Sequence, residues 1–413
     1  MRGQRLSNGL KAALLAFCTM TLLATNAYAA AWKVLHNGTE NGGEQPCARV
    51  IFDTAGNLYG TFSTGGAHGL GTVFKLTPAA DGSWTEKVLH SFNGKDGASP
   101  YAGLVFDAAG NLYGTTEYGG PEGYGSAFEL TPTAGGAWKY SVVHTFGYGI
   151  DGDYPMASLI FDAAGNLYGT TYSGGRFKDG TVFELSPKAG GGWTERILHS
   201  FSPKGTDGIL PQGGAGVIFD AAGNLYGTTG LGGDYGGGTV FELSPDASGG
   251  WTEKVLYSFG DGTDGLYPTG SLVLDATGNI YGITNFGSDG GGGTVFELTP
   301  NAGGGWTDTV LYGFSNQGDG GSPLAGLVFD ASGNLYGTTE EGGSNNSCFE
   351  GCGTVFELSP GAGGVWTEKV YSFNGKDGES IFSSVTLDAA GNIYGTAHNG
   401  GASDQGTVFE ITP

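Results

Sequence analysis

The sequence has few basic residues. Lys and Arg together number 17, against 40 Asp and Glu, so the formal net charge is −23. A surface this acidic repels nucleic acid and anionic lipid. We therefore expect no nucleic-acid partner, and we interpret the negative charge as a source of solubility outside the cell. The alternative interpretation is that the charge attracts cations or basic ligands.

Long hydrophobic runs are missing after the N-terminus. Residues 1–29 contain three basic residues (Arg2, Arg5 and Lys11), an apolar run over residues 12–24 that is too short to span a bilayer, and a small-x-small end over residues 27–29. These are the features of a secretory signal peptide. We expect residues 30–413 to be exported, to the extracellular space or the periplasm, as one domain that does not insert into a membrane.

Cysteine is scarce. Cys18 lies within the signal peptide and follows the bulky Phe17, which argues against a lipoprotein. Cys47, Cys348 and Cys352 remain, and an odd number does not resemble a disulfide framework. Because Cys348 and Cys352 lie four residues apart in one Gly- and Asn-rich loop, we predict a disulfide between them and a free thiol at Cys47.

Several catalytic motifs are also absent. The sequence contains no G-x-S-x-G, no H-E-x-x-H and no phosphate-binding loop. Serine hydrolase, zinc protease and nucleotide chemistry therefore have no support from motifs.

Glycine is abundant, with 84 of the 413 residues. Collagen is excluded because the sequence shows no strict three-residue period and has only 15 Pro. Gly in a helix interior costs about 1 kcal/mol relative to Ala, which disfavours long helices. The 7 Trp, 20 Tyr and 24 Phe argue against disorder. An all-β fold with many turns remains.

The seven Trp residues mark a repeat. They lie 52 to 60 residues apart, at Trp32, Trp84, Trp138, Trp193, Trp251, Trp306 and Trp366. In the unit that begins at Trp84, strand-like segments occupy residues 84–92, 104–107, 111–116 and 125–130. The turn Asp-Ala-Ala-Gly-Asn at residues 107–111 joins the second segment to the third, and its Gly can adopt the left-handed conformation that a short hairpin requires.

Four antiparallel strands in each of seven units predict a seven-bladed β-propeller of four-stranded antiparallel blades. The short apolar segment is placed innermost and the Trp segment outermost. The mature chain then begins with an outermost strand, residues 32–36, and ends with a third strand, residues 407–411. We expect the N-terminal strand to complete the last blade and close the ring. We number blade 1 from Val50 and blade 7 from Val385.

The repeated pattern L-V-F-D-A-A-G-N-L-Y-G-T-T, followed by G-T-V-F-E-L-T-P, resembles the bacterial GloVer tandem repeat of exported choice-of-anchor proteins. The resemblance covers the mature chain in seven copies. It implies an exported β-propeller-like repeat protein and brings no established activity or catalytic residues. Such proteins commonly end in a surface-anchoring segment, whereas this sequence ends at Pro413 directly after a strand, so we expect a freely exported protein.

Residues that recur in most units are interpreted as scaffold. An Asp opens each hairpin turn, and seven copies indicate turn capping rather than acid chemistry. A packing column holds His36, His90, His144, His199, Tyr257 and Tyr312. A second Asp column precedes Gly in the loop that leads into the innermost strand. Turn capping is one interpretation of this column and calcium ligation the other: Asp96, Asp151, Asp207, Asp264, Asp319 and Asp377.

Two loops of each blade are expected at the same end of the ring, which we call the wide end. One loop leads into the innermost strand, and the other joins the second strand to the third. Variable loops on a rigid frame carry function. The position after Gly-Thr-Thr varies most, as expected for residues that face a ligand: Ser63, Glu117, Tyr172, Gly230, Asn285, Glu340 and His398.

Unusual ionisable groups gather on the neighbouring blades 6, 7, 1 and 2. Arg49 takes a position near the axis that is Gly or Ser in the other units. His68 and His398 lie in corresponding loops of blades 1 and 7. Blades 6 and 2 add acidic residues: Glu340, Glu341 and Glu117. This arc is the predicted functional site, and solvated loop charges are the alternative.

The favoured function is a secreted module that binds an extracellular polysaccharide or protein. We expect a monomer without a cofactor, with calcium as the alternative. Aromatic residues at the wide end either stack on sugars or pack the loops: Tyr118, Tyr172, Tyr235 and Phe286.

The alternative function is a polysaccharide-active enzyme. A lyase requires a base near the acidic carbon, here His398 or His68, and a cation for the substrate carboxylate, here Arg49. A glycoside hydrolase requires two carboxyl groups, for which Glu117 and Glu340 are candidates. Blades 2 and 6 stand apart on the ring, which weakens that pair.

Overall fold

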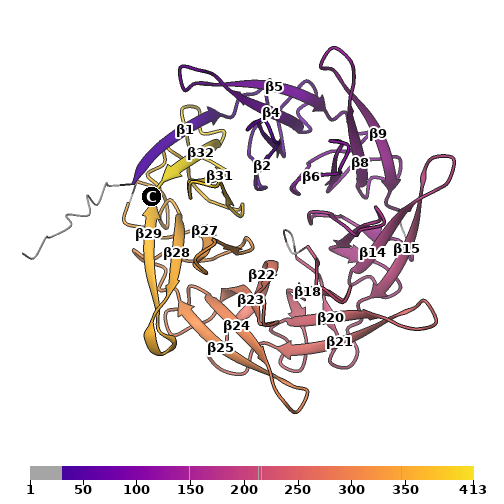
Figure 1. Ribbon diagram of the computed structural model, residues 1–413, viewed down its shortest axis with the longest axis vertical. Coiled ribbons are helices and arrows are strands. Elements are labelled where there is room, and N and C mark those ends of the chain that lie inside the picture. Colours follow the sequence, from indigo (N-terminus) through magenta and orange to yellow (C-terminus); the bar gives the residue numbers. More distant parts are fainter. Residues whose placement is uncertain (1–29, 148, 213, 215, 346) are drawn as a thin grey trace, which may run out of the picture.

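The structure is a computed structural model that describes residues 30–413 apart from residues 148, 213, 215 and 346. The expected signal peptide, residues 1–29, lies outside the described residues. Seven four-stranded antiparallel sheets surround a central axis as blades (Figure 1). The prediction of a seven-bladed β-propeller is therefore confirmed.

The strands of each blade follow one another from the axis outward. Blade 1 contains β2 (Ile51–Phe52), β3 (Leu58–Phe62), β4 (Thr72–Pro78) and β5 (Trp84–Ser91), and blade 2 contains β6 (Val105–Phe106), β7 (Leu112–Thr116), β8 (Ser126–Pro132) and β9 (Trp138–Thr145). Blade 3 contains β11 (Ile160–Phe161), β12 (Leu167–Thr171), β14 (Thr181–Pro187) and β15 (Trp193–Ser200), and blade 4 contains β17 (Ile218–Phe219), β18 (Leu225–Thr229), β20 (Thr239–Pro245) and β21 (Trp251–Ser258).

The remaining blades have the same order. Blade 5 contains β22 (Leu266–Leu274), β23 (Ile280–Phe286), β24 (Thr294–Pro300) and β25 (Trp306–Gly313). Blade 6 contains β26 (Val328–Phe329), β27 (Leu335–Thr339), β28 (Thr354–Pro360) and β29 (Trp366–Ser372), and blade 7 contains β30 (Thr386–Leu387), β31 (Ile393–Ala397), β32 (Thr407–Thr412) and β1 (Ala31–Asn37). Two small extra ladders join β10 (Gly152–Asp153) to β13 (Ser173–Gly174) and β16 (Gly208–Ile209) to β19 (Leu231–Gly232).

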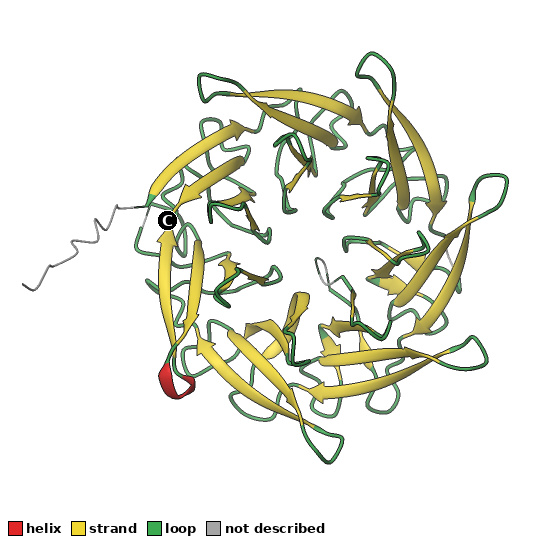
Figure 2. Cartoon of the chain, viewed as in Figure 1, coloured by secondary structure: helices red, strands yellow, loops and turns green. Residues whose placement is uncertain are grey.

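Helix is almost absent from this fold. Within the described residues the only helical segment is the short 3-10 turn η1 (Ala362–Gly364), drawn in red in Figure 2. In the same part of the chain, no helix has the length and apolar composition that a bilayer crossing requires.

The two ends of the chain close the ring. β1 pairs antiparallel with β32, with Trp32 opposite Ile411 and Asn37 opposite Thr407. The Trp32 ring packs edge-on against Phe373 of blade 6, with ring centroids 4.7 Å apart. The N-terminal strand thus supplies both the outer edge of blade 7 and part of its contact with blade 6, as the strand order predicts.

The hydrophobic core lies between the blades. Seven clusters of buried side chains each join two neighbouring blades. Between blades 1 and 2, for example, Tyr59 and Val73 pack with Leu104, Leu112 and Phe128. Burial of a side chain of this size contributes about 1.5–3 kcal/mol, so most of the stability arises at interfaces that a single blade cannot form.

Two repeated glycines have different physical roles. Gly110 adopts a φ of +85° in the hairpin turn, where the Asp107 carboxylate accepts hydrogen bonds from the backbone N–H groups of Ala109 and Asn111. Gly114 lies opposite Phe128 in the sheet, and a Cβ there would be 2.7 Å from the Phe128 ring. The first glycine permits the turn, and the second lets an aromatic ring cross the strand.

A polar layer accompanies several of the hydrophobic interfaces. There, a His or Tyr near the end of an outermost strand lies close to the Asp of the next loop and to an acidic residue of the next outermost strand. Between blades 5 and 6, Tyr312 donates a hydrogen bond of 2.6 Å to Glu368 and contacts Asp319 at 3.5 Å. The column interpreted above as packing therefore also makes polar contacts.

Deletion of residues 30–37 tests ring closure. The shortened protein should expose the edge of β32 and lose the Trp32–Phe373 contact, so it should melt at a lower temperature and tend to associate. Differential scanning calorimetry and size-exclusion chromatography measure these effects. A synthetic peptide of residues 30–38 should restore part of the loss, and a shortened protein that remains monomeric and melts like the full chain would contradict the proposed closure.

The buried acids of the interfaces should make stability depend on pH. Burial, together with the charges of Asp264 and Asp319, raises the pKa values of Asp308 and Glu368 to about 7. The folded protein then holds protons that the unfolded chain loses above a pH of about 4, so stability should fall as the pH rises from about 4 to about 7. The melting temperature should therefore be lower at pH 8 than at pH 5.

The double variant Asp308→Asn, Glu368→Gln should reduce that pH dependence because both replacements stay neutral. Glu122→Gln, at an exposed position, is the matched control and should melt like the unaltered protein at both pH values. Equal pH dependence in the double variant and the unaltered protein would show that these two carboxyl groups do not carry the effect.

Candidate functional site

Backbone hydrogen bonds constrain the loops that form the wide end. In each blade one non-glycine residue at the corresponding position has a left-handed φ between 50° and 59°, and it precedes the innermost strand in six blades and lies near the start of β22 in blade 5: Gln45, Ser99, Tyr154, Leu210, Tyr267, Ser322 and Ser380. Its N–H donates to a carbonyl of the preceding blade, as Ser99 does to Leu70 at 2.9 Å. Its carbonyl accepts from the variable position in six blades, as Ser99 does from Glu117. The sequence analysis did not identify these residues.

A cavity of about 400 Å³ lies on the axis and is lined by residues of all seven blades. Most of the lining is small or apolar, as at Ala102, Leu272 and Val217. Arg49 is the one charged residue among the described residues that line it, and Tyr101 and Gln212 add polar groups. Several lining residues precede the innermost strands, so the cavity reaches the wide end.

Arg49 lies in this cavity without a protein partner. Among the described residues, no hydrogen bond or ion pair to its guanidinium is found. The side chain is accessible to water, yet the surrounding walls desolvate it and lower its pKa. Exposure to water and a lowered pKa are compatible when the water that Arg49 meets is confined within the cavity. An unpaired cation in such a place favours an anionic ligand.

The corresponding small residues of other blades explain why Arg49 is unusual. The Ser158 hydroxyl accepts a hydrogen bond of 3.0 Å from the Gly103 backbone, and the Ser384 hydroxyl donates one of 2.7 Å to the Gly326 carbonyl. This column therefore packs one blade against the next around the axis. In blade 1 the long Arg49 side chain passes near Gly103.

Cys47 and Tyr101 form a buried polar contact beside Arg49. Cys47 is 4% exposed, and its Sγ lies 3.8 Å from the Ser63 hydroxyl. Burial raises the pKa of the Cys47 thiol to about 12, although hydrogen bonds with Ser63 and Tyr101 oppose this shift. Burial also raises the pKa of Tyr101 above its ordinary value, helped by the negative charges around it. Tyr101 was not among the residues predicted for the site.

Glu117 and Glu340 lie near the same tyrosine. Burial raises the pKa of both carboxyl groups, and the charges of Glu341 and Glu350 raise that of Glu340 further. The charges of Glu117 and Glu340 both act on Tyr101. Blades 2 and 6 are separated on the ring, yet the charges of both carboxyl groups act on Tyr101, which lines the central cavity.

The two predicted histidines occupy different environments. The His398 ring packs against Phe382, a cavity-lining residue, with centroids 4.7 Å apart. Burial lowers the pKa of His398, and its Nδ1 lies 2.8 Å from the Asn399 side-chain oxygen. His68 is exposed in the loop between β3 and β4 and has no contact with Arg49 or His398 among the described residues.

The predicted ligand-binding column is not uniform. Ser63 and Asn285 are buried, and their side chains hydrogen-bond to the backbone carbonyls of Gln45 and Pro323. Tyr172 and Glu341 are partly buried. Tyr118 is 46% exposed, hydrogen-bonds to Glu117, and packs edge-on against Tyr154 with centroids 5.4 Å apart. The Tyr118 ring is thus exposed to solvent.

The second Asp column caps its own loops. Asp96 accepts a hydrogen bond of 2.9 Å from the Asn93 backbone, and Asp207 accepts one of 3.0 Å from the Ser202 backbone. Turn capping accounts for these contacts without an ion. Calcium ligation by this column stays a prediction.

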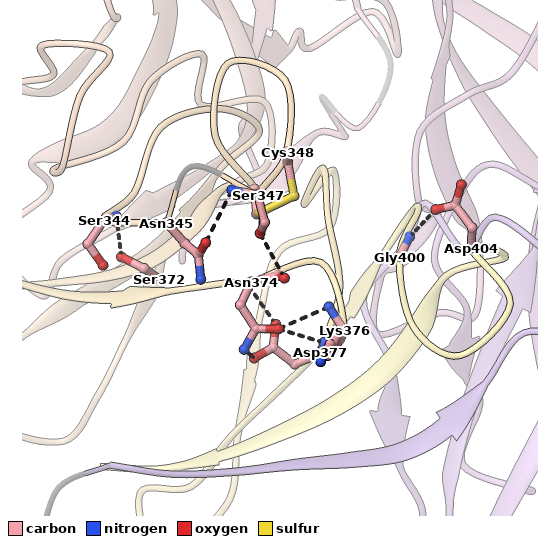
Figure 3. The surroundings of a disulfide bond; sticks show 11 residues. Ser344, Asn345, Ser347, Cys348, Ser372, Asn374, Lys376, Asp377, Gly400 and Asp404 are labelled. Atoms are coloured by element: carbon pink, nitrogen blue, oxygen red, sulfur yellow. Dashed lines mark hydrogen bonds between the residues drawn. A yellow bond between two sulfur atoms is a disulfide. The ribbon is translucent and has the colours of Figure 1, made fainter.

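The loop disulfide anticipated above is present. Cys348 and Cys352 form a disulfide in the loop between β27 and β28 (Figure 3). Cys47 is free. The Ser347 hydroxyl donates a hydrogen bond of 3.0 Å to the backbone carbonyl of Asn374, in the loop that leads to blade 7 (Figure 3). The disulfide therefore constrains a loop that also contacts the neighbouring blade.

Comparison with known proteins gives a family match. The model described as Gloeobacter/Verrucomicrobia repeat matches residues 21–216 and 214–413. No curated protein matches the chain.

Two solved structures are similar at low identity. A candidate oxidoreductase (glucose dehydrogenase) from Thermus thermophilus has 18% identity and a TM-score of 0.44, over 76% of this chain and 96% of that one. A protein of unknown function from Dyadobacter fermentans has 11% identity and a TM-score of 0.46, over 92% and 98%. Neither similarity indicates the activity of this chain.

Burial of Cys47 should make its thiol unreactive. Iodoacetamide at pH 8 should leave Cys47 unmodified in the folded protein and alkylate it after unfolding, because the thiol is 4% exposed and its pKa is about 12. Cys348, which is partly exposed, should react once its disulfide is reduced and serves as the control. Peptide mapping by mass spectrometry reads both sites, and alkylation of Cys47 at the rate of a free thiol would refute its burial.

Proposed function

We propose that this chain, which belongs to the Gloeobacter/Verrucomicrobia repeat family, is an exported binding module that takes a carboxylate-bearing sugar of an extracellular polysaccharide into the central cavity. Export is inferred from the signal-peptide features of residues 1–29. The unpaired Arg49 in the axial cavity is the observation that carries the choice of ligand.

A sugar acid complements the groups around Arg49. Its carboxylate would accept charge-assisted hydrogen bonds from the guanidinium, and its hydroxyl groups would donate to Glu117 or Glu340. The exposed Tyr118 ring offers an apolar face for the sugar. At physiological ionic strength the Debye length is about 8 Å, so the negative outer surface is largely screened from a ligand at the cavity mouth.

Cleavage of the same polysaccharide is the second candidate function. The specific observation in its favour is that the charges of Glu117 and Glu340, both carboxyl groups with raised pKa values, act on Tyr101, which lines the cavity with Arg49. Raised carboxyl pKa values suit general acids at neutral pH. In a lyase Arg49 would neutralise the substrate carboxylate while a base removed the neighbouring proton.

Replacement of Arg49 tests the proposed ligand. Arg49→Ser introduces the residue that occupies this column in other blades, so the melting temperature should change little. Loss of a charge-assisted contact of about 1.5–3 kcal/mol should weaken binding of an acidic polysaccharide roughly tenfold to a hundredfold. Isothermal titration calorimetry with polymers selected from a glycan array, run beside a thermal melt, measures both properties.

The control removes the same charge elsewhere. Lys188→Ser, at an exposed position in the turn between β14 and β15, should bind as tightly as the unaltered protein. A product assay on the same polymers separates the two candidate functions, because only an enzyme releases shortened or unsaturated chains. If Arg49→Ser binds acidic polymers with unchanged affinity, the cavity is not the binding site.

A further inference from the structure

Two blade interfaces contain a complete set of metal-ligating side chains away from the axis. Between blades 2 and 3, His144 of β9 has its Nε2 3.4 Å from Asp151 and 3.6 Å from Glu195 of β15. Between blades 3 and 4, His199 of β15 and Asp207 lie 3.2 Å apart, with Glu253 of β21 beside them.

In each set, one imidazole nitrogen and two carboxylate oxygens lie within 4.8 Å of one another. All six residues are partly buried. The two sets therefore place the same three donor types in one compact arrangement, at neighbouring interfaces.

The other five interfaces lack one member of the set or replace it. Blade 1 has Gly42 in place of the Asp, and blade 2 has Tyr140 in place of the Glu. At the following interfaces a Tyr replaces the His, as at Tyr257 and Tyr312. Their hydroxyl groups donate to the acids directly: Tyr257 to Asp264 at 3.0 Å and Tyr312 to Glu368 at 2.6 Å. Among the described residues, only two interfaces thus combine an imidazole with two carboxyl groups.

At each of these two interfaces a buried carboxylate oxygen has no hydrogen-bond donor among the described residues. These atoms are Oε1 of Glu195 and Oε1 of Glu253. An ion in the centre of each set would satisfy these oxygens. Buried polar atoms without partners are uncommon in folded proteins.

The spacing suits a small transition-metal ion. Zn²⁺ binds His nitrogen and carboxylate oxygen at about 2.0–2.2 Å in a tetrahedron, which places neighbouring ligand atoms roughly 3.3–3.5 Å apart. The separations of 3.4 and 3.6 Å from His144 and of 3.2 Å between His199 and Asp207 lie near that value, and the other ligand atoms of each set lie within 4.8 Å of one another. Calcium and magnesium prefer all-oxygen sites, so the imidazole favours a metal of the zinc class.

We propose that the protein binds two zinc-class divalent cations, one held by His144, Asp151 and Glu195 and one by His199, Asp207 and Glu253. Each ion joins two adjacent blades, because the His belongs to one outermost strand and the Glu to the next. A water molecule would complete each tetrahedron. Since the folded ring alone assembles these ligands, bound metal stabilises the closed propeller.

Replacement of the histidines by tyrosine gives a sharp test, because tyrosine occupies the same column in other blades and donates a hydrogen bond to one of the acids there. Protein treated with a chelator and dialysed should bind two Zn²⁺ per chain in isothermal titration calorimetry and melt at a higher temperature with Zn²⁺. His144→Tyr and His199→Tyr should each remove one ion, and the double variant should bind none and show no melting shift with Zn²⁺.

His90→Tyr is the matched control because its interface lacks the Glu, and this variant should keep both ions. Titration with Ca²⁺ should give neither binding at these sites nor a melting shift that the histidine replacements abolish. The proposal is overturned if the unaltered protein binds no Zn²⁺, if the double variant binds as many ions as the unaltered protein, or if Ca²⁺ binds at these residues in preference to Zn²⁺.

Discussion

Burial of aromatic and aliphatic side chains between neighbouring blades is the interaction on which the rest of the structure depends. Each blade is a small sheet whose apolar face is covered only by the next blade, as Tyr59 and Phe128 show between blades 1 and 2. Because every interface needs two blades, a ring without free ends is the arrangement that covers all of them. The pairing of β1 with β32 completes that ring and joins the two ends of the chain within one sheet.

The repeated frame permits single blades to depart from the pattern. Ser158 and Ser384 tie neighbouring blades together around the axis, whereas Arg49 in blade 1 makes no such bond and leaves a cation in the cavity. The other six blades keep a small residue at this position, so the repeated packing around the axis is altered at one blade only. Left-handed residues such as Ser99 and Ser322 fix the backbone of the loops that carry Glu117 and Glu340.

The polar layer between blades shows how one structural position acquires different chemistry. The Tyr312 hydroxyl group donates a hydrogen bond to the Glu368 carboxyl group. His144 and His199 offer a ring nitrogen instead, and the same acids then form a set that accepts a cation. A change of one side chain in a repeated column thus converts an ordinary packing contact into a candidate metal site without a change of backbone.

The sequence by itself determined the seven-fold repeat, the order of strands in each blade, the closure by residues 31–37 and the pairing of Cys348 with Cys352, since each depends on spacing along the chain. Only the tertiary structure decided that Tyr101 and Cys47 lie beside Arg49, that Ser63 and Asn285 are buried, and that Glu117 and Glu340 act on the same hydroxyl. The same holds for the sets around His144 and His199, which the sequence analysis interpreted as packing. These relations join residues of different blades, and their distances depend on the radius of the ring and on side-chain conformations, which spacing along the chain does not specify.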